Sequence, residues 1–265
     1  RLSWYDAATT NLLSGAVTNR QTINAKVTPY AGAVFDLTEW LSAYSSYTEI
    51  FQPQTETDIS GTVLDPREGR QVEAGLKAEF FDGNVNASMA YFNLRDVNRA
   101  VADPGNPGVS IAQGEVEVQG FEIEASGTVL PGWEISGGYT FTDSQYLNGG
   151  SAGQVFSTYT PKHMLQLWTK YTFDERFDRL NGLFVGGGLT AFSSFSSVSR
   201  GITIEAPGYI TADLMAGYKL NDNLTATLNI NNVFDKKYYS RVGGNSVFNF
   251  YGEPRSAQFR LSAKF

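Results

Sequence analysis

Apolar and polar residues alternate with a period of two in several stretches of the chain, as in β-strands that have one apolar face. The stretch 257–265 (AQFRLSAKF) carries only apolar residues on one face, namely Ala257, Phe259, Leu261, Ala263 and Phe265. The stretches 71–80, 209–220 and 224–231 repeat the pattern, and every charge in them falls on the polar face. This sorting predicts antiparallel strands whose two faces meet different surroundings.

The connections between the expected strands alternate in length. Short turns lie at 36–40, 80–85, 130–133 and 219–224, with a longer member at 173–182, and long polar stretches lie at 52–70, 98–117, 146–162, 194–208 and 238–254. Short connections on one side and long ones on the other, through about eleven strands of roughly ten or more residues, are typical of an outer-membrane β-barrel. The sequence therefore predicts an all-β, transmembrane antiparallel β-barrel with periplasmic turns and extracellular loops.

This orientation predicts what surrounds the C-terminal residue, Phe265. The apolar face that carries Phe265 would meet lipid, with the ring in the periplasmic aromatic girdle. Residues 1–6 would form the top of one more upward strand. A soluble β-sandwich also alternates, but it tends to shorter strands and does not segregate its loops by length.

The composition agrees with strands and excludes several classes. Apolar residues make up 42% of the chain, charged residues 18% and aromatic residues 14%, with 27 Gly, a mixture that favours strands over helices. No run approaches the roughly 18 apolar residues of a membrane helix. The chain has no Cys, which excludes disulfides and thiolate metal sites, and its net charge of −7 argues against a nucleic-acid surface.

Several motifs resemble TonB-dependent outer-membrane ferric-siderophore receptors of the ferrichrome, coprogen and pyoverdine kind. The motifs are EGRQVEAGLKAEFFDGNVNASMAYFNLRDVNRA, VEVQGFEIEASGTVLPGWEISGGYTFTDS, STYTPKHMLQLWTKYTF, LNINNVFDKKYY and YGEPRSAQFRLSAKF, in family order from about residue 37 to residue 265. The resemblance implies a barrel of twenty-two strands around an N-terminal plug. It implies uptake of ferric chelates with energy relayed by TonB, working with ExbB and ExbD, in the Gram-negative outer membrane.

The sequence departs from that family because it contains no plug-like segment and no TonB box. We therefore expect residues 1–265 to be the C-terminal portion of the barrel domain, with about 11–12 strands and the plug domain absent. On this interpretation TonB would act through the missing N-terminal region, outer-membrane lipid would surround the strands, and ferric iron would be present only as the siderophore chelate, with no cofactor. The ligand would be a hydroxamate or mixed-type siderophore.

Other candidate sites are better read as structural features. The single histidine, His163, stands at a strand entrance, and no partners for a metal site or a catalytic dyad can be assigned to it, so we expect a structural role. The VGGGL stretch at 185–189 lacks the helix and Lys of a phosphate loop, and Gly in a strand marks a bend or close packing. The DGN and NDN stretches are turns rather than calcium sites. We expect no catalytic residue and no metal ligand, and Pro161, Asn232, Asp235 and Pro254 should set turns and strand starts.

The predicted ligand contacts are aromatic and basic residues of the loops and upper strands. Aromatic packing suits a compact organic chelate, and Arg or Tyr can donate to its oxygens. The predicted site residues are Phe51, Arg99, Tyr146, Phe195, Arg200, Phe248 and Tyr251. Two further hypotheses stay open on the sequence: a small self-contained porin or outer-membrane enzyme, and a soluble β-sandwich binding module.

Overall fold

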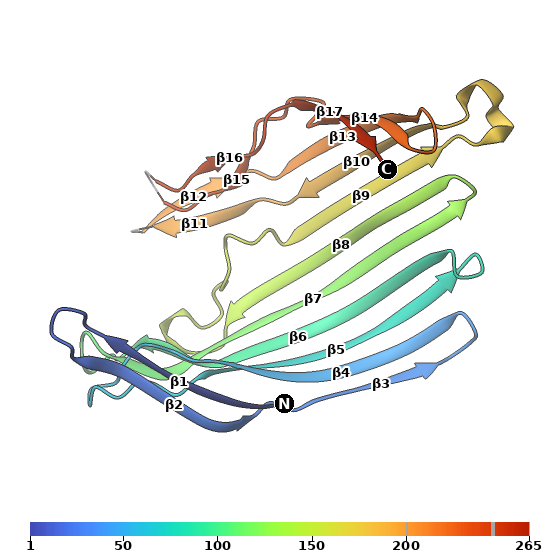
Figure 1. Cartoon of the computed structure of the whole chain (residues 1–265). Coiled ribbons are helices and arrows are strands. Elements are labelled where there is room, and N and C mark those ends of the chain that lie inside the picture. Colours follow the sequence, from blue (N-terminus) through green and yellow to red (C-terminus); the bar gives the residue numbers. More distant parts are fainter. Residues whose placement is uncertain (200, 245–246, 265) are drawn as a thin grey trace.

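The structure is built around one large antiparallel sheet. The computed structural model describes residues 1–199, 201–244 and 247–264. Eleven strands lie side by side in the order β17-β14-β13-β10-β9-β8-β7-β6-β5-β4-β3, the reverse of their order along the chain (Figure 1). They are β3 (Tyr30–Asp36), β4 (Leu41–Gln52), β5 (Arg67–Phe80), β6 (Val85–Ala102), β7 (Ser110–Leu130), β8 (Trp133–Tyr146), β9 (His163–Thr172), β10 (Leu183–Phe192), β13 (Tyr209–Lys219), β14 (Leu224–Asn231) and β17 (Ser256–Ala263).

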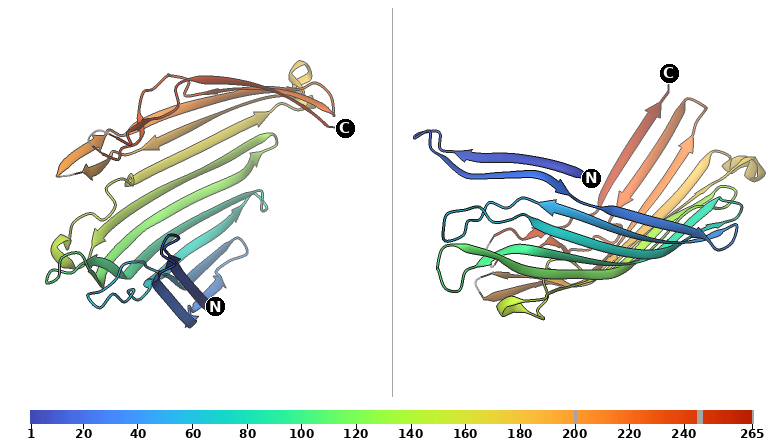
Figure 2. Two further views of the ribbon diagram at one scale, coloured as in Figure 1. Left: turned by 60° about the vertical axis from the view of Figure 1, so that its left-hand side comes forward. Right: turned by 90° about the horizontal axis from the view of Figure 1, so that it is seen from below.

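The sheet curves across its width, so that it forms a partial barrel with a concave and a convex face (Figure 2). Strands β3 and β17 are its two edges. No second large sheet packs against it in the described part of the chain. The fold class predicted from the sequence is therefore confirmed, and the β-sandwich alternative is wrong.

The register places apolar residues opposite apolar residues. Ala226 of β14 lies opposite Tyr218 of β13 on one side and Leu261 of β17 on the other. Residues in such pairs share a face of the sheet. This face is open, since Leu214 is 50% exposed and Phe259 69%, as expected of side chains that meet lipid rather than a protein core.

The connections are short at one end of the sheet and long at the other, as predicted. The short end carries the turns 37–40, 81–84, 131–132 and 220–223, and the longer connection there contains the 3₁₀ helix η2 (Glu175–Leu180). The long end carries the loop 53–66, the 3₁₀ helix η1 (Gly149–Ser151), and two small hairpins, β11 (Phe195–Ser199) with β12 (Ile202–Ala206) and β15 (Tyr239–Arg241) with β16 (Phe250–Tyr251). By the general rule for outer-membrane barrels, the long end is extracellular.

Two expectations need correction. The stretch 98–117 is mostly strand, because Arg99 pairs with Gly114 and Ala102 with Ser110, which leaves only 103–109 as loop. A bulge at Asn98, where φ is 58°, separates this upper part of β6 from the rest of the strand. The N-terminal residues form β1 (Leu2–Thr10), which pairs with β2 (Val17–Val27) in a hairpin of its own rather than within the large sheet.

The expected structural roles of two motif positions are confirmed. Asn232 is 4% exposed, and its side chain donates to the carbonyl oxygens of Lys236 and Glu253 at 2.9 and 3.0 Å. Asp235 accepts the backbone N–H of Arg255 at 3.0 Å, so these residues join the end of β14 to the start of β17. The glycines of β10 are close-packing positions, since a Cβ on Gly188 would stand 2.4 Å from the indole of Trp168.

Among the described residues, no helix is long and apolar enough to cross a membrane. The expectation for Phe265 and the site prediction for Arg200 fall outside the described residues.

Candidate functional site

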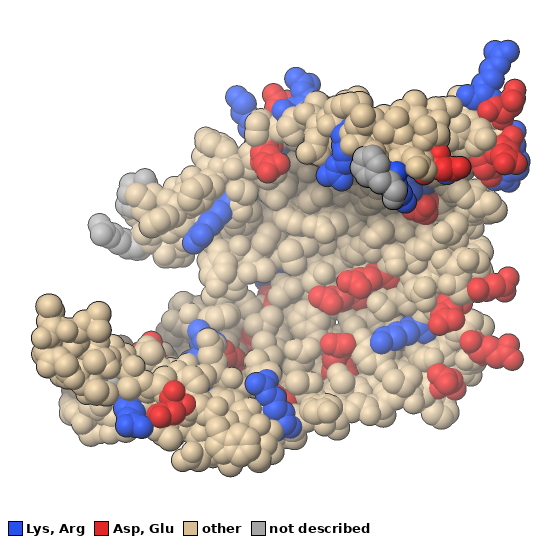
Figure 3. All heavy atoms as spheres, in the orientation of Figure 1, with Lys and Arg blue, Asp and Glu red and all other residues tan. Residues whose placement is uncertain are grey.

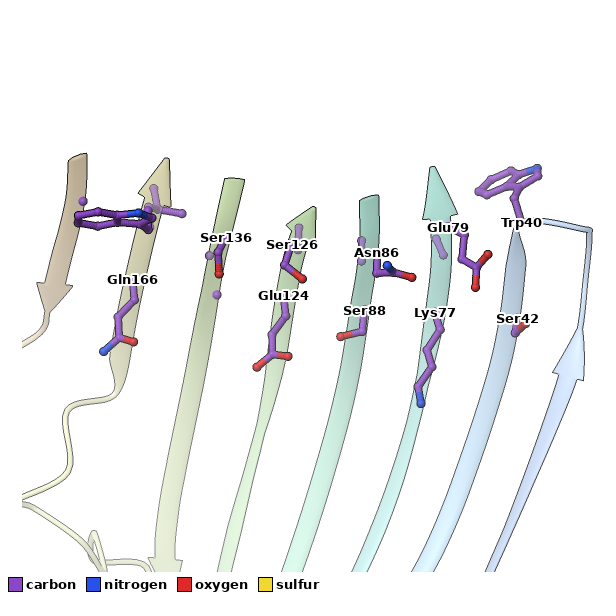
Figure 4. Close-up of a pocket in the computed structure, with 18 of the residues that line it drawn as sticks. Trp40, Ser42, Lys77, Glu79, Asn86, Ser88, Glu124, Ser126, Ser136 and Gln166 are labelled. Atoms are coloured by element: carbon purple, nitrogen blue, oxygen red, sulfur yellow. The ribbon is translucent and has the colours of Figure 1, made fainter. Parts of the chain in front are cut away.

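The concave face of the sheet holds a hollow of about 1340 Å³. Side chains from neighbouring strands point to the same side there, including Lys77, Asn86, Glu124, Ser136 and Gln166 (Figure 4). These residues occupy the polar positions of the alternating pattern, which explains why a single curved sheet forms a hydrophilic inner wall.

The inner wall carries more acidic than basic side chains around β5 and β7. Glu73 accepts the hydroxyl of Tyr44 at 2.6 Å, and the Nζ atom of Lys77 lies 4.9 Å from the centre of the Tyr44 ring. Glu122 and Glu124 stand on the same face of β7. Toward the short turns, at the right of Figure 3, acidic side chains also gather at the rim. Around β5 and β7 the inner wall therefore presents a mainly negative surface to the lumen, whereas Lys170, Lys219 and Arg260 line it near β9, β13 and β17.

The extracellular loops near β4–β8 are held in place by hydrogen bonds from the side-chain amides of Gln54 and Asn148. Gln54 is 7% exposed, and its Nε2 donates to the carbonyl oxygens of Asp65 and Asn98 at 2.5 and 2.7 Å. Its Oε1 accepts the backbone N–H of Ala100 at 2.9 Å. In the same way Asn148 accepts from the N–H of Glu115 at 3.0 Å. The loops that carry Gln54 and Asn148 are thus fastened to the upper parts of β6 and β7.

A second group of loops packs through apolar side chains. Phe195, Ala206 and Val242 form a buried cluster that joins the β11–β12 hairpin to β15. Tyr239 packs against this cluster. The ring of Tyr251 stacks on the ring of Tyr239, with the two centroids 4.7 Å apart. The backbone N–H of Ser196 donates to the carbonyl of Thr158 at 2.7 Å, which links this group to the β8–β9 loop. The described parts of these loops therefore pack against one another at the long end of the sheet.

The structure separates the predicted ligand residues into two kinds. Arg99 pairs with Asp96 at 2.6 Å and lies 4.7 Å from the centre of the Phe156 ring, which also packs edge-on against Tyr146. Phe195 is only 7% exposed. Arg99, Tyr146 and Phe195 therefore hold loops together.

The other predicted residues lie apart from that contact network. Phe51 shares the face of β4 that carries Ala43 and Tyr47, so it points to the convex side. Phe248 and Tyr251 are 63% and 69% exposed. The structure therefore does not gather the described members of the predicted set into one site, and Phe248 and Tyr251 are the most accessible of them.

Two extracellular carboxylates are held ionised by the turns in which they lie. The hydroxyl of Ser60 and the N–H of Thr62 donate to Asp58 and lower the pKa of that carboxyl. The side-chain amide of Asn106 and the N–H of Gly105 do the same to the pKa of Asp103. Both side chains therefore serve turn geometry, as Asp commonly does.

His163 lies on the convex face. Its Nδ1 is 2.7 Å from the hydroxyl of Tyr139, and its ring centre is 5.1 Å from that of Phe141. These aromatic contacts agree with the structural role expected for it. The sequence reasoning did not single out Trp168, Gln166 or Glu124 of the inner wall, although their alternation with apolar neighbours was the signal that could have placed them there.

The family model of the TonB dependent receptor-like β-barrel matches residues 1–233. The ferric-pyoverdine M114 receptor PbuA of Pseudomonas sp. (strain M114) is 36% identical over 100% of this chain and 33% of its own length. The ferripyoverdine receptor of Pseudomonas aeruginosa is 38% identical over 87% of this chain and 29% of its own. The chain spans about a third of the length of these relatives.

The fold is also similar to a solved structure. P. aeruginosa FpvA, in a structure bound to heterologous pyoverdines, superposes with a TM-score of 0.84 and 34% identity over 98% of this chain and 35% of that one. The relatives are receptors and transporters of the outer membrane rather than enzymes, and they take ferric siderophores as ligands.

Proposed function

The chain belongs to the TonB-dependent receptor β-barrel family of Gram-negative outer membranes, and from this we propose that it is part of a receptor that takes up a ferric siderophore. The observation that carries the proposal is the match of the family model over residues 1–233, together with a curved sheet that has a polar concave face and ordered loops at one end. We further propose a hydroxamate or mixed-type siderophore as the ligand.

We propose that residues 1–265 are the C-terminal portion of the barrel domain and that a plug domain in another part of the protein fills the lumen. The share of the relatives' length that this chain spans and the two edge strands of the sheet support this arrangement. In the whole receptor the loops would capture the chelate. Rearrangement of the plug by TonB, with ExbB and ExbD, would then let the chelate pass along the inner wall.

Of the predicted ligand contacts, Phe248 and Tyr251 are the two that we propose to pack against the chelate. Both rings are largely exposed, and the stacked Tyr239 ring holds Tyr251 in place, so little conformational entropy is lost when a ligand packs on it. Arg99, Tyr146 and Phe195 would support the loops that frame the site. Phe51 and Arg200 remain predictions from the sequence.

The test is a binding titration of the full-length receptor, purified in detergent, with ferric hydroxamate, mixed-type and catecholate siderophores. Tyr251→Ala should weaken binding of the preferred chelate by about tenfold, the effect of losing roughly 1–2 kcal/mol of aromatic packing. Phe259→Ala, on the lipid face of β17, is the matched control and should leave affinity unchanged. A receptor that binds none of the chelates would contradict the proposed function, and equal losses in both variants would contradict the role of Tyr251.

A further inference from the structure

A second hollow, of about 590 Å³, lies at the upper end of β8–β10 and β13. Its floor is one row of residues paired across four strands: Tyr139 with Leu165, Leu165 with Ala191, and Ala191 with Ile210. This row belongs to the apolar face of the sheet, which carries Leu214 farther down β13. The hollow therefore opens on the lipid side of the barrel.

The hollow exists because small side chains follow the row toward the loops. Ser193 and Gly208 line its upper part, between His163 on one side and Lys236 on the other. A Cβ on Gly208 would stand 2.8 Å from the carbonyl oxygen of Phe192, so the chain can pass there only without a side chain. The result is a groove with an apolar floor and a polar upper end.

The groove lies at the depth of the outer-leaflet headgroups. On β8 the lipid face begins at Trp133 and reaches Tyr139 and Phe141 before polar residues start at Asp143. The eight residue steps from Trp133 to Phe141 span roughly 26 Å along the strand, which a tilt of about 40° reduces to about 20 Å of height, close to the apolar band of such barrels. Tyr139 and Phe141 thus mark the upper boundary of the band, where the groove begins.

Lys236 is the cation at this boundary. Asn232 fixes its backbone, accepting the Lys236 N–H at 2.8 Å and donating to its carbonyl at 2.9 Å. Arg95 and Lys162, which also lie above the band, pair with Glu117 and Asp143, whereas no carboxylate of the described residues lies within ion-pair distance of Lys236 Nζ. No described residue lining the groove is acidic. The upper end of the groove is therefore complementary to an anion.

We propose that this groove binds a phosphorylated lipid of the outer leaflet, with an acyl chain on the Leu165–Ala191–Ile210 floor and the phosphate on Lys236. A basic group next to a membrane-facing apolar groove is the arrangement that recognises anionic lipid headgroups. The site lies outside the lumen, on the lipid side of the sheet, and its lining includes neither Phe248 nor Tyr251 of the proposed siderophore site.

The experiment is native mass spectrometry of the full-length receptor in detergent micelles with added diphosphoryl lipid A. Lys236→Ala should reduce the lipid-bound fraction about tenfold, as expected for loss of one charge-assisted contact. Lys237→Ala, the adjacent exposed lysine that does not line the groove, should bind as the unmodified receptor does. Ala191→Phe should block the floor, whereas Ala216→Phe, lower on the same lipid face, should not.

Three controls distinguish a specific lipid site from nonspecific adsorption and from a damaged receptor. Inorganic phosphate alone should not compete, and a dephosphorylated lipid A should bind weakly and without sensitivity to Lys236→Ala. Siderophore binding should be retained in all four variants, so failure here is distinct from failure of the proposed function. Any of four results would overturn the proposal. The Lys236 and Lys237 variants could lose lipid binding equally, or Ala191→Phe could bind lipid as the unmodified receptor does. Inorganic phosphate could compete with the lipid, or the spectra could show a doubled receptor mass in place of bound lipid.

Discussion

Replacing Gln54 with leucine should loosen the extracellular loops selectively. The side chain is 7% exposed and makes three hydrogen bonds to backbone groups of two other segments. A leucine side chain is of similar size but can neither donate nor accept a hydrogen bond. The Ala100 N–H then loses its acceptor, and the carbonyls of Asp65 and Asn98 lose a donor.

The size of the destabilisation is set mainly by the Ala100 N–H, the donor that is left without an acceptor. A buried donor left unpaired costs about 1–3 kcal/mol, and the two carbonyls add less because each keeps a second lone pair for water or a neighbour. A local destabilisation of about 2 kcal/mol raises the population of the open loop about 30-fold. Amide hydrogen exchange at Ala100 should accelerate by that factor, because exchange there reports local opening.

The assay is hydrogen exchange with mass spectrometry on the full-length receptor, following a peptide that covers 98–104. Gln52→Leu is the matched control, since Gln52 is exposed and makes no side-chain hydrogen bond among the described residues. Exchange should be unchanged in the control and in the strands of the membrane band. Acceleration below about threefold in Gln54→Leu, or the same acceleration in both variants, would refute the role of Gln54 as the tie between loops.

Three further predictions test which face of β14 meets lipid, how closely β7 and β8 pack at Gly120, and what holds the turn at Asp103. Leu228→Lys on the lipid face of β14 should lower the free energy of unfolding in vesicles by about 2–4 kcal/mol, and Asn229→Lys on the lumen face by less than about 1 kcal/mol; equal losses in urea titrations would contradict the face assignment. Gly120→Ala should cost about 1–3 kcal/mol in the same titration, because the added Cβ would stand 1.9 Å from a carbonyl oxygen of β8, whereas Gly138→Ala, with nothing nearer than 3.5 Å, should be almost neutral. Because the pKa of Asp103 is lowered, its turn is stabilised at pH values above the ordinary Asp pKa and loses that stability as pH falls through the lowered pKa. A carboxyl ¹³C titration by NMR should find a pKa below the ordinary Asp value. A raised pKa would contradict the hydrogen bonds described for Asp103.

The large sheet could be predicted from the sequence because its signal is local. Every strand that meets lipid on one side must alternate, and residues such as Leu224, Leu228 and Leu261 reveal the face without knowledge of their partners. The short turns were found for the same reason, since Asp, Asn and Gly at 82–84 and 221–223 mark them within a few residues.

The loops could not be predicted because their contacts are distant in the chain. Gln54 bonds to Ala100, 46 residues away, and Ser197 bonds to Gly243, also 46 residues away. No composition rule distinguishes such a buried Gln from an exposed one. Nor could the sequence show that Arg99 and Phe195 hold loops, because cation–π and apolar packing pairs are set by the fold rather than by spacing.

Uptake of radioactive iron would show whether this chain is part of a siderophore receptor driven by TonB. Cells that carry the full-length gene in place of their own siderophore receptors would be given the ⁵⁵Fe-loaded chelate that binds best, with tonB intact or deleted. Iron should accumulate only when both the receptor and TonB are present. Accumulation that persists without TonB would identify a passive pore, and the absence of accumulation for every chelate would contradict the claim.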